Sequence, residues 1–135
     1  MRSRIILAAV VVLGALSSGT LATSGRGVTP ARQWAIASFS DPVLVTDQLL
    51  MGTFLIVHDD ALMERGEPCT SFYRFDPAKG PQEEVVAFHC TPVNRALAST
   101  FTVTTTDPLP SVGARRLTEY QFAGDCEGHA IPTKH

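Results

Sequence analysis

The segment CTSFYRFDPAKGPQEEVVAFHC, residues 69–90, holds two runs of β-branched and aromatic residues around a turn rich in proline and glycine. This pattern predicts a β-hairpin that folds about Lys79 and Gly80. The hairpin sets Cys69 opposite Cys90, at a Cα separation of about 4.5–5.5 Å, which is within the range of a disulfide. We therefore predict a Cys69–Cys90 disulfide, which would stabilise the fold by about 3 kcal/mol.

The same register places Tyr73 opposite Val86 and Ser71 opposite Phe88. Because side chains alternate along a strand, one face of the hairpin is predicted to be mostly apolar. That face comprises Cys69, Tyr73, Phe75, Val86, Phe88 and Cys90. A shift of the register by one residue would remove this arrangement, so the alternative pairings of the cysteines stay open.

The chain beyond residue 31 repeats this pattern of short apolar runs separated by Pro, Gly and Asp. Phe54–Val57 is apolar on both faces, which predicts a strand in the middle of a sheet. Asp59–Gly66 begins with acids and ends with Arg-Gly, which predicts one short helix near 59–66. About seven strands predict an all-β fold, either an antiparallel sandwich or a small barrel. The expected strands are 33–38, 43–47, 50–58, 70–75, 83–90, 99–106 and 115–123.

The N-terminal residues have the order of a secretory signal peptide. Met1–Arg4 is basic, Ile5–Leu16 is an apolar run, and small residues lead to a cleavage site after Ala22. We expect residues 1–22 to be the signal peptide, 23–31 a flexible mature N-terminus, and 32–135 a single β domain. The mature protein is then exported, to the periplasm or the extracellular space, where thiols oxidise.

The charge balance limits the classes of partner. The chain has 11 basic and 13 acidic side chains, and loss of the leader removes Arg2 and Arg4, so the mature net charge becomes −4. Without a basic face, nucleic acid and anionic membranes are not expected partners. The apolar run Ile5–Leu16 is shorter than the roughly 20 residues that cross a bilayer, so no stable membrane insertion is expected after cleavage.

Several metal-binding residue types occur in three places. His58 closes the central strand, His89 precedes Cys90, and Asp125, Glu127 and His129 alternate after the last expected strand. In an extended segment the last three would point the same way. These donors suit zinc or copper. However, their spacings match no established ligand pattern, and the acids are also ordinary turn and surface residues, so both interpretations stay open.

The third cysteine and two large aromatic residues allow further alternatives. Cys126 is expected to be a partly buried small apolar residue; an intermolecular disulfide and a metal thiolate are the alternatives. Trp34 and Tyr120 are expected in the core or at its edge, with a ligand-binding platform as the alternative.

Catalytic patterns are weak. The sequence has no Gly-x-Ser-x-Gly elbow, and Cys126 with His129 lacks an obvious oxyanion hole. We therefore predict no catalytic or cofactor-binding residue and regard an enzyme as the less favoured class.

Two adjacent stretches resemble a known group. Phe39–Val45 contains a Pro-Val strand, and Leu49–Ile56 contains Leu-x-x-Gly-Thr-Phe. Together they resemble the start of small exported bacterial β-domain proteins, a group without an assigned activity, in which Tyr usually stands at the position of Phe54. The resemblance implies a β fold and transfers no site residue.

The sequence thus favours an exported accessory or binding module of a bacterial envelope, with a protein or a small molecule as its partner. The alternative is a periplasmic or secreted zinc- or copper-binding protein, and the third is a small secreted hydrolase. The metal alternative requires that His58, His89 and His129 converge in the folded chain.

Overall fold

The computed structural model describes residues 32–133. Within this range the strands hydrogen-bond in the order β4-β3-β2-β1-β7-β8-β5, and β6 pairs with β7. The predicted all-β class is therefore confirmed. The elements are β1 (Arg32–Val45), β2 (Gln48–Asp59), α2 (Asp60–Glu64), β3 (Thr70–Asp76), β4 (Gly80–Phe88), β5 (Thr91–Asn94), β6 (Thr102–Thr105), β7 (Arg115–Gln121) and β8 (Glu127–Ala130).

The predicted signal peptide 1–22 and the segment 23–31 lie outside the described residues. Within residues 32–133, no helix combines the length and apolarity needed to cross a membrane.

Strand β1 joins two strands that the sequence predicts separately, 33–38 and 43–47. It is a single strand of 14 residues, with a register irregularity between Phe39 and Val43 where it pairs with β2. Beyond the irregularity β1 also pairs with β7, and this pairing is parallel, with Val43 opposite Arg115. The expectation of a wholly antiparallel sheet was therefore wrong. A parallel pair needs a long crossover connection, and here that connection is the chain from β2 to β6.

The central strand and the helix agree with the sequence. β2 lies between β1 and β3, as the two-sided apolar run Phe54–Val57 predicts. Helix α2 begins after Asp59, whose carboxylate accepts hydrogen bonds from the backbone N–H groups of Ala61 and Leu62. The chain leaves the helix through Gly66 in the left-handed region, at φ 73°.

The hairpin of β3 and β4 forms as predicted, but its register differs. Phe72 lies opposite Val86, where the sequence placed Tyr73, and the pairing shifts again on both sides of Tyr73. As a result Phe72 is fully buried, and Tyr73 is only half-buried on the other face. The cause is local, because β-bulges insert residues that alternation alone does not count.

Two strands were not predicted. β5 and β8 each have four residues, pair with each other, and β8 also pairs with β7. Such short strands give too few alternating positions to be recognised from sequence.

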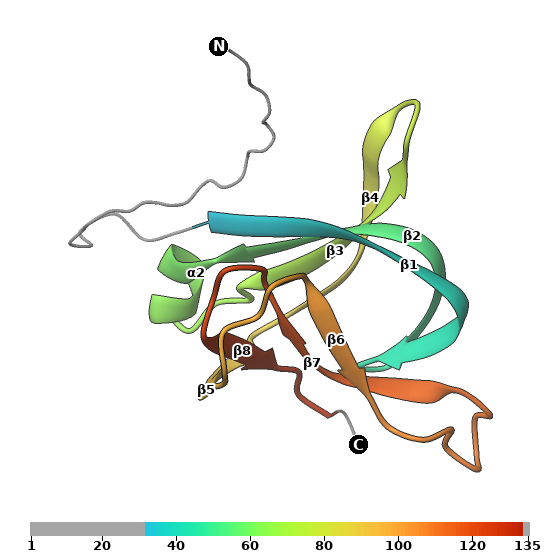
Figure 1. Cartoon of the computed structure of the whole chain (residues 1–135). Helices are drawn as coiled ribbons and strands as arrows, with labels where there is room; N and C mark the ends of the chain where they lie inside the picture. The colour runs from blue at the N-terminus through green and yellow to red at the C-terminus, as the bar shows by residue number, and fades with distance from the viewer. Residues whose placement is uncertain (1–31, 134–135) are drawn as a thin grey trace.

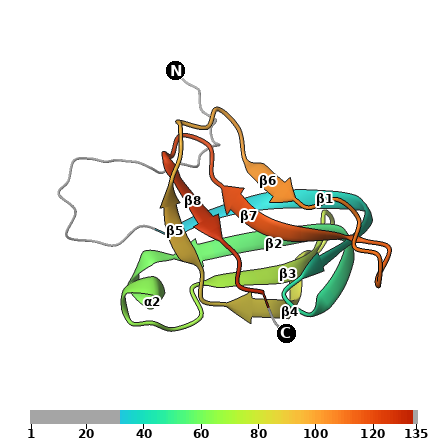
Figure 2. The same ribbon diagram turned by 90° about the horizontal axis from the view of Figure 1, so that it is seen from below.

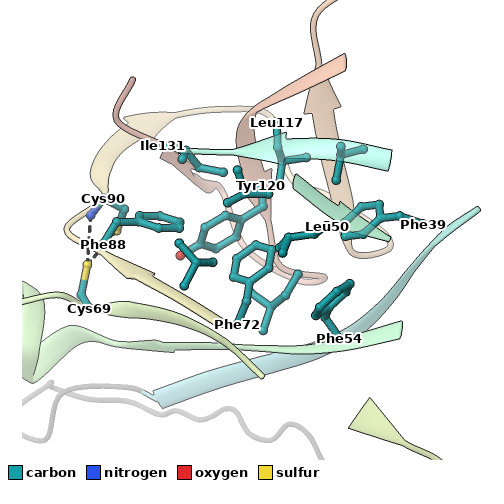
Figure 3. Packing of buried hydrophobic residues seen from close by; sticks show 14 of the residues in the cluster. Phe39, Leu50, Phe54, Cys69, Phe72, Phe88, Cys90, Leu117, Tyr120 and Ile131 are labelled. Atoms are coloured by element: carbon teal, nitrogen blue, oxygen red, sulfur yellow. Dashed lines mark hydrogen bonds between the residues drawn. The ribbon is translucent and has the colours of Figure 1, made fainter. Parts of the chain in front are cut away.

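The core lies between two parts of the folded sheet. In Figures 1 and 2, strands β5–β8 lie over one face of the layer formed by β1–β4. The aromatic and aliphatic side chains between them form one cluster (Figure 3). It comprises Phe39, Val43, Val45, Leu50, Phe54, Ile56, Cys69, Phe72, Val86, Phe88, Cys90, Leu117, Tyr120, Phe122 and Ile131.

Tyr120 is in the core as expected, with 1% of its surface exposed, but Trp34 is 54% exposed. Trp34 instead lines a shallow groove on the outer face of the sheet together with Ile36, Leu55 and Val57. Its position follows from alternation, because Ala35 and Ala37 occupy the inward face of β1.

The observed register makes a stability prediction. Phe72→Ala should lower the free energy of unfolding by about 3–5 kcal/mol, because it leaves a cavity in the core. Tyr73→Ala is the matched control and should cost less than about 2 kcal/mol, because Tyr73 is half-exposed. Urea denaturation of both variants measures the difference. A larger loss for Tyr73→Ala would support the register expected from the sequence.

Candidate metal centre

Four chain segments bring sulfur and imidazole groups together at one end of the core. His58 lies near the end of β2, Cys69 precedes β3, Cys90 lies in the link between β4 and β5, and His129 lies in β8. None of these residues is more than 2% exposed. Figure 3 shows Cys69 and Cys90 at the end of the cluster opposite Phe39.

The Cys90 sulfur is at the centre of this group. Its distance to the Cys69 sulfur is 3.0 Å, to His58 Nδ1 3.7 Å and to His129 Nδ1 3.6 Å. The donor atoms of His58, Cys69 and Cys90 all lie within 4.8 Å of one another. The backbone N–H of Cys90 also donates to the Cys69 sulfur at 3.2 Å. The group therefore offers two sulfurs and one imidazole to a single ion, with a second imidazole adjacent.

Helix α2 orients His58. The Nε2 atom of His58 lies 2.9 Å from a carboxylate oxygen of Asp60, in the first turn of α2. Because a carboxylate accepts, Nε2 carries the proton, and the lone pair on Nδ1 then faces Cys90 and the hydroxyl of Tyr120, which is 3.4 Å away. A carboxylate behind the imidazole is the usual support of a histidine that binds a metal.

His129 is buried with an unused polar atom. Its Nε2 is the one buried side-chain nitrogen or oxygen in residues 32–133 that has no hydrogen-bond partner. The nearest carboxylate oxygen, from Glu127, is 3.9 Å away. The ring stacks on Tyr120 at a centroid distance of 4.9 Å and lies 4.2 Å from the His58 ring. Burial, and then the neighbouring His58, lower the pKa of His129 to about 4, so the imidazole is neutral at pH 7 and able to act as a ligand.

The side chains of Cys90 and Tyr120 are also uncharged without an ion. Burial, followed by the hydrogen bond with Cys69, raises the pKa of the Cys90 thiol to about 12. Burial likewise raises the pKa of Tyr120, whose hydroxyl hydrogen-bonds to Thr70. An ion that binds here must therefore displace a proton from Cys90, because a thiolate is the ligand.

The structure brings together two of the five metal ligands that the sequence suggests, His58 and His129. His89 is exposed, and its Nδ1 donates to the carbonyl oxygen of Glu67 at 3.1 Å. The same nitrogen lies 4.0 Å from the Cys69 sulfur.

The two predicted acidic ligands lie at the start of β8: Asp125 is in the turn before this strand, and Glu127 is its first residue. Asp125 accepts hydrogen bonds from the side chain of Gln33 and from the backbone N–H of Glu127. Glu127 is half-buried, and burial, followed by the charge of Asp125, raises its pKa. The carboxylate of Asp125 is therefore hydrogen-bonded beside the cluster, and that of Glu127 approaches it only at the 3.9 Å separation from His129 Nε2.

Sequence reasoning assigned Cys69 and Cys90 to a disulfide and so did not combine them with the histidines. In the structure both cysteines are free thiols. The alternation of Phe54, Ile56 and His58 along β2 was the available signal that His58 faces the core. Cys126 is exposed, which contradicts its expected partial burial.

Comparison of the chain with protein-family models, with curated proteins and with solved structures finds no match. The resemblance to small exported bacterial β-domain proteins stays a prediction. The functional argument therefore depends on the geometry of the cluster.

The lowered pKa of His129 makes stability depend on pH. The unfolded imidazole titrates near 6.5 and the folded one near 4, so the unfolded state binds more protons between these values. Above about pH 6.5 this titration does not lower the free energy of unfolding. As the pH drops to 4, the free energy of unfolding should fall by up to about 3 kcal/mol.

The measurement is urea denaturation of the chelator-treated protein between pH 4 and 7. His129→Phe should flatten this pH dependence, whereas His89→Gln, at an exposed position, should leave it unchanged. An identical slope in the wild type and His129→Phe would contradict the assignment.

Proposed function

We propose that this chain is an exported metal-binding β domain. The ion is zinc or copper(I), and its ligands are His58, Cys69 and Cys90, with His129 as a fourth donor. The observation that carries the proposal is the convergence of buried His58, Cys69 and Cys90, with His129 Nδ1 3.6 Å from the Cys90 sulfur, from four separate segments. Buried sulfur and imidazole groups are the donors that both ions take in proteins.

The distances support a shared ion. Zinc lies about 2.3 Å from sulfur and about 2.0–2.1 Å from nitrogen, so tetrahedral coordination separates a sulfur and a nitrogen ligand by about 3.6 Å. The Cys90 sulfur lies 3.7 Å from His58 Nδ1 and 3.6 Å from His129 Nδ1. Two sulfur ligands would lie about 3.8 Å apart, so the thiols must separate by roughly 0.8 Å when an ion enters.

The position of the cluster supports a stabilising role for the ion. β4 and β5 are the two ends of the hydrogen-bonded strand order, and no pairing joins them within residues 32–133. Cys90 lies in the link between them. An ion there would tie β2, the start of β3 and β8 to this link, and so close the sheet into the small barrel or sandwich that the sequence predicts.

The full burial of the donors favours a structural or carrier ion over catalysis. A catalytic ion keeps an open position for water or substrate, and four protein donors leave none. The broader class, an accessory or binding module of a bacterial envelope, includes this proposal, with the metal ion as the bound partner.

A second candidate is the disulfide between Cys69 and Cys90 that the sequence predicts. The observation in its favour is the 3.0 Å separation of the two sulfurs, in a protein expected to reach an oxidising space. Disulfide formation and metal binding exclude each other, because both use the same thiols.

Metal content tests the first proposal. The mature protein, purified without an affinity tag and reconstituted under reducing conditions, should hold one zinc or copper ion per chain by elemental analysis. Cys90→Ser should lose the ion, because it removes the central sulfur. Cys126→Ser is the matched control and should keep it, because Cys126 is exposed outside the cluster. Less than a tenth of an ion per wild-type chain, or equal losses in both variants, would reject the metal site.

Thiol counting separates the two candidates. Mature protein that is isolated from the exported fraction and denatured with chelator, with no reductant at any step, should show three titrating thiols, one from each cysteine. A Cys69–Cys90 disulfide would leave only Cys126, so a count of one per chain would favour the disulfide.

A further inference from the structure

A third sulfur lies beside the cluster. The thioether of Met63 is 3.9 Å from the Cys90 sulfur. Met63 belongs to α2 and packs partly buried against the core. The same helix provides Asp60, which orients His58. A helix of five residues, placed by its Asp59 cap, therefore directs both a thioether and an imidazole toward Cys90.

We propose that Met63 is a ligand that makes this centre selective for copper(I); this inference rests on the proposed metal-binding function. A thioether is a soft, neutral donor, which suits copper(I), whereas structural zinc sites use thiolate and imidazole ligands. Copper(I) is then held by Cys69, Cys90, His58 and Met63. Zinc uses the first three with His129 in place of Met63.

The separation of the sulfurs fits this assignment. Two sulfur ligands about 2.3 Å from one tetrahedral ion lie about 3.8 Å apart. The Met63 and Cys90 sulfurs are 3.9 Å apart, so a shared ion would require almost no movement of Met63 relative to Cys90. By contrast, the Cys69 and Cys90 sulfurs must move apart.

The two fourth donors lie around the same sulfur. His129 Nδ1 is 3.6 Å from the Cys90 sulfur and Met63 Sδ is 3.9 Å from it. We therefore expect zinc to take the nitrogen of His129 as its fourth ligand and copper(I) to take the sulfur of Met63. Either donor can be removed by a single substitution.

The test compares the affinities of the reduced mature protein for copper(I) and zinc, each measured anaerobically by competition with a chromophoric chelator. Met63→Leu keeps the size and apolar character of the side chain but removes the sulfur. It should weaken copper(I) binding at least tenfold and change zinc binding less than threefold. His129→Phe should do the reverse. Met51→Leu, at an exposed methionine of β2, is the control and should alter neither affinity.

X-ray absorption at the copper edge gives a second readout. Wild-type protein should show three sulfur neighbours around copper, and Met63→Leu should show two. Equal effects of Met63→Leu on both metals, no effect on either, or an unchanged sulfur count would overturn the role of Met63 while leaving the metal site intact. A wild type that binds neither ion would overturn the proposed function and this inference together.

Discussion

The pairing of β1 with β7 is the constraint on which the fold depends. Within the part of the chain that the structure describes, it is the one strand pairing between the β1–β4 layer and strands β5–β8. It forms only because β1 continues beyond the irregularity after Phe39 and presents Val43 and Leu44 to β7. The β1–β7 pairing lies inside the strand order, and β4 and β5 are its two ends. Because β5 follows β4 directly in the chain, a short link must join these two ends. The link that joins them contains Cys90.

Polar groups at this link are buried away from water. A neutral His129 with an unpartnered nitrogen is costly to bury, and an apolar residue would pack there without that cost. A bound ion would stabilise the Cys90 thiolate and use the lone pair on His129 Nδ1, and His129 Nε2 would then carry the proton. Asp60 already holds the His58 ring in the orientation that this requires. The imidazole of His129, whose burial weakens the metal-free core, is therefore also a donor of the proposed site.

The sequence predicts those features that arise from local patterns. The apolar run Phe54–Val57 identifies β2 as an interior strand, because it is apolar on both faces, and an acid before a helix former identifies the cap of α2. The register of β3 and β4 could not be predicted, because strict alternation does not count the irregularities on both sides of Tyr73. The cluster could not be predicted either. His129 lies in a strand too short to recognise, and its approach to Cys90 depends on the path of the whole sheet.

The complete burial of the cluster has a kinetic consequence. None of His58, Cys69, Cys90 and His129 is more than 2% exposed, so exchange of the proposed ion requires a fluctuation that parts β8 or α2 from the rest of the core. The five-residue helix α2 has no fully buried side chain, and Leu62 and Met63 pack against the core only partly buried, so we expect α2 to be the element most easily displaced. The rate at which α2 opens would then limit both loading and release of the ion. A competing chelator in solution could accelerate neither process beyond that opening rate.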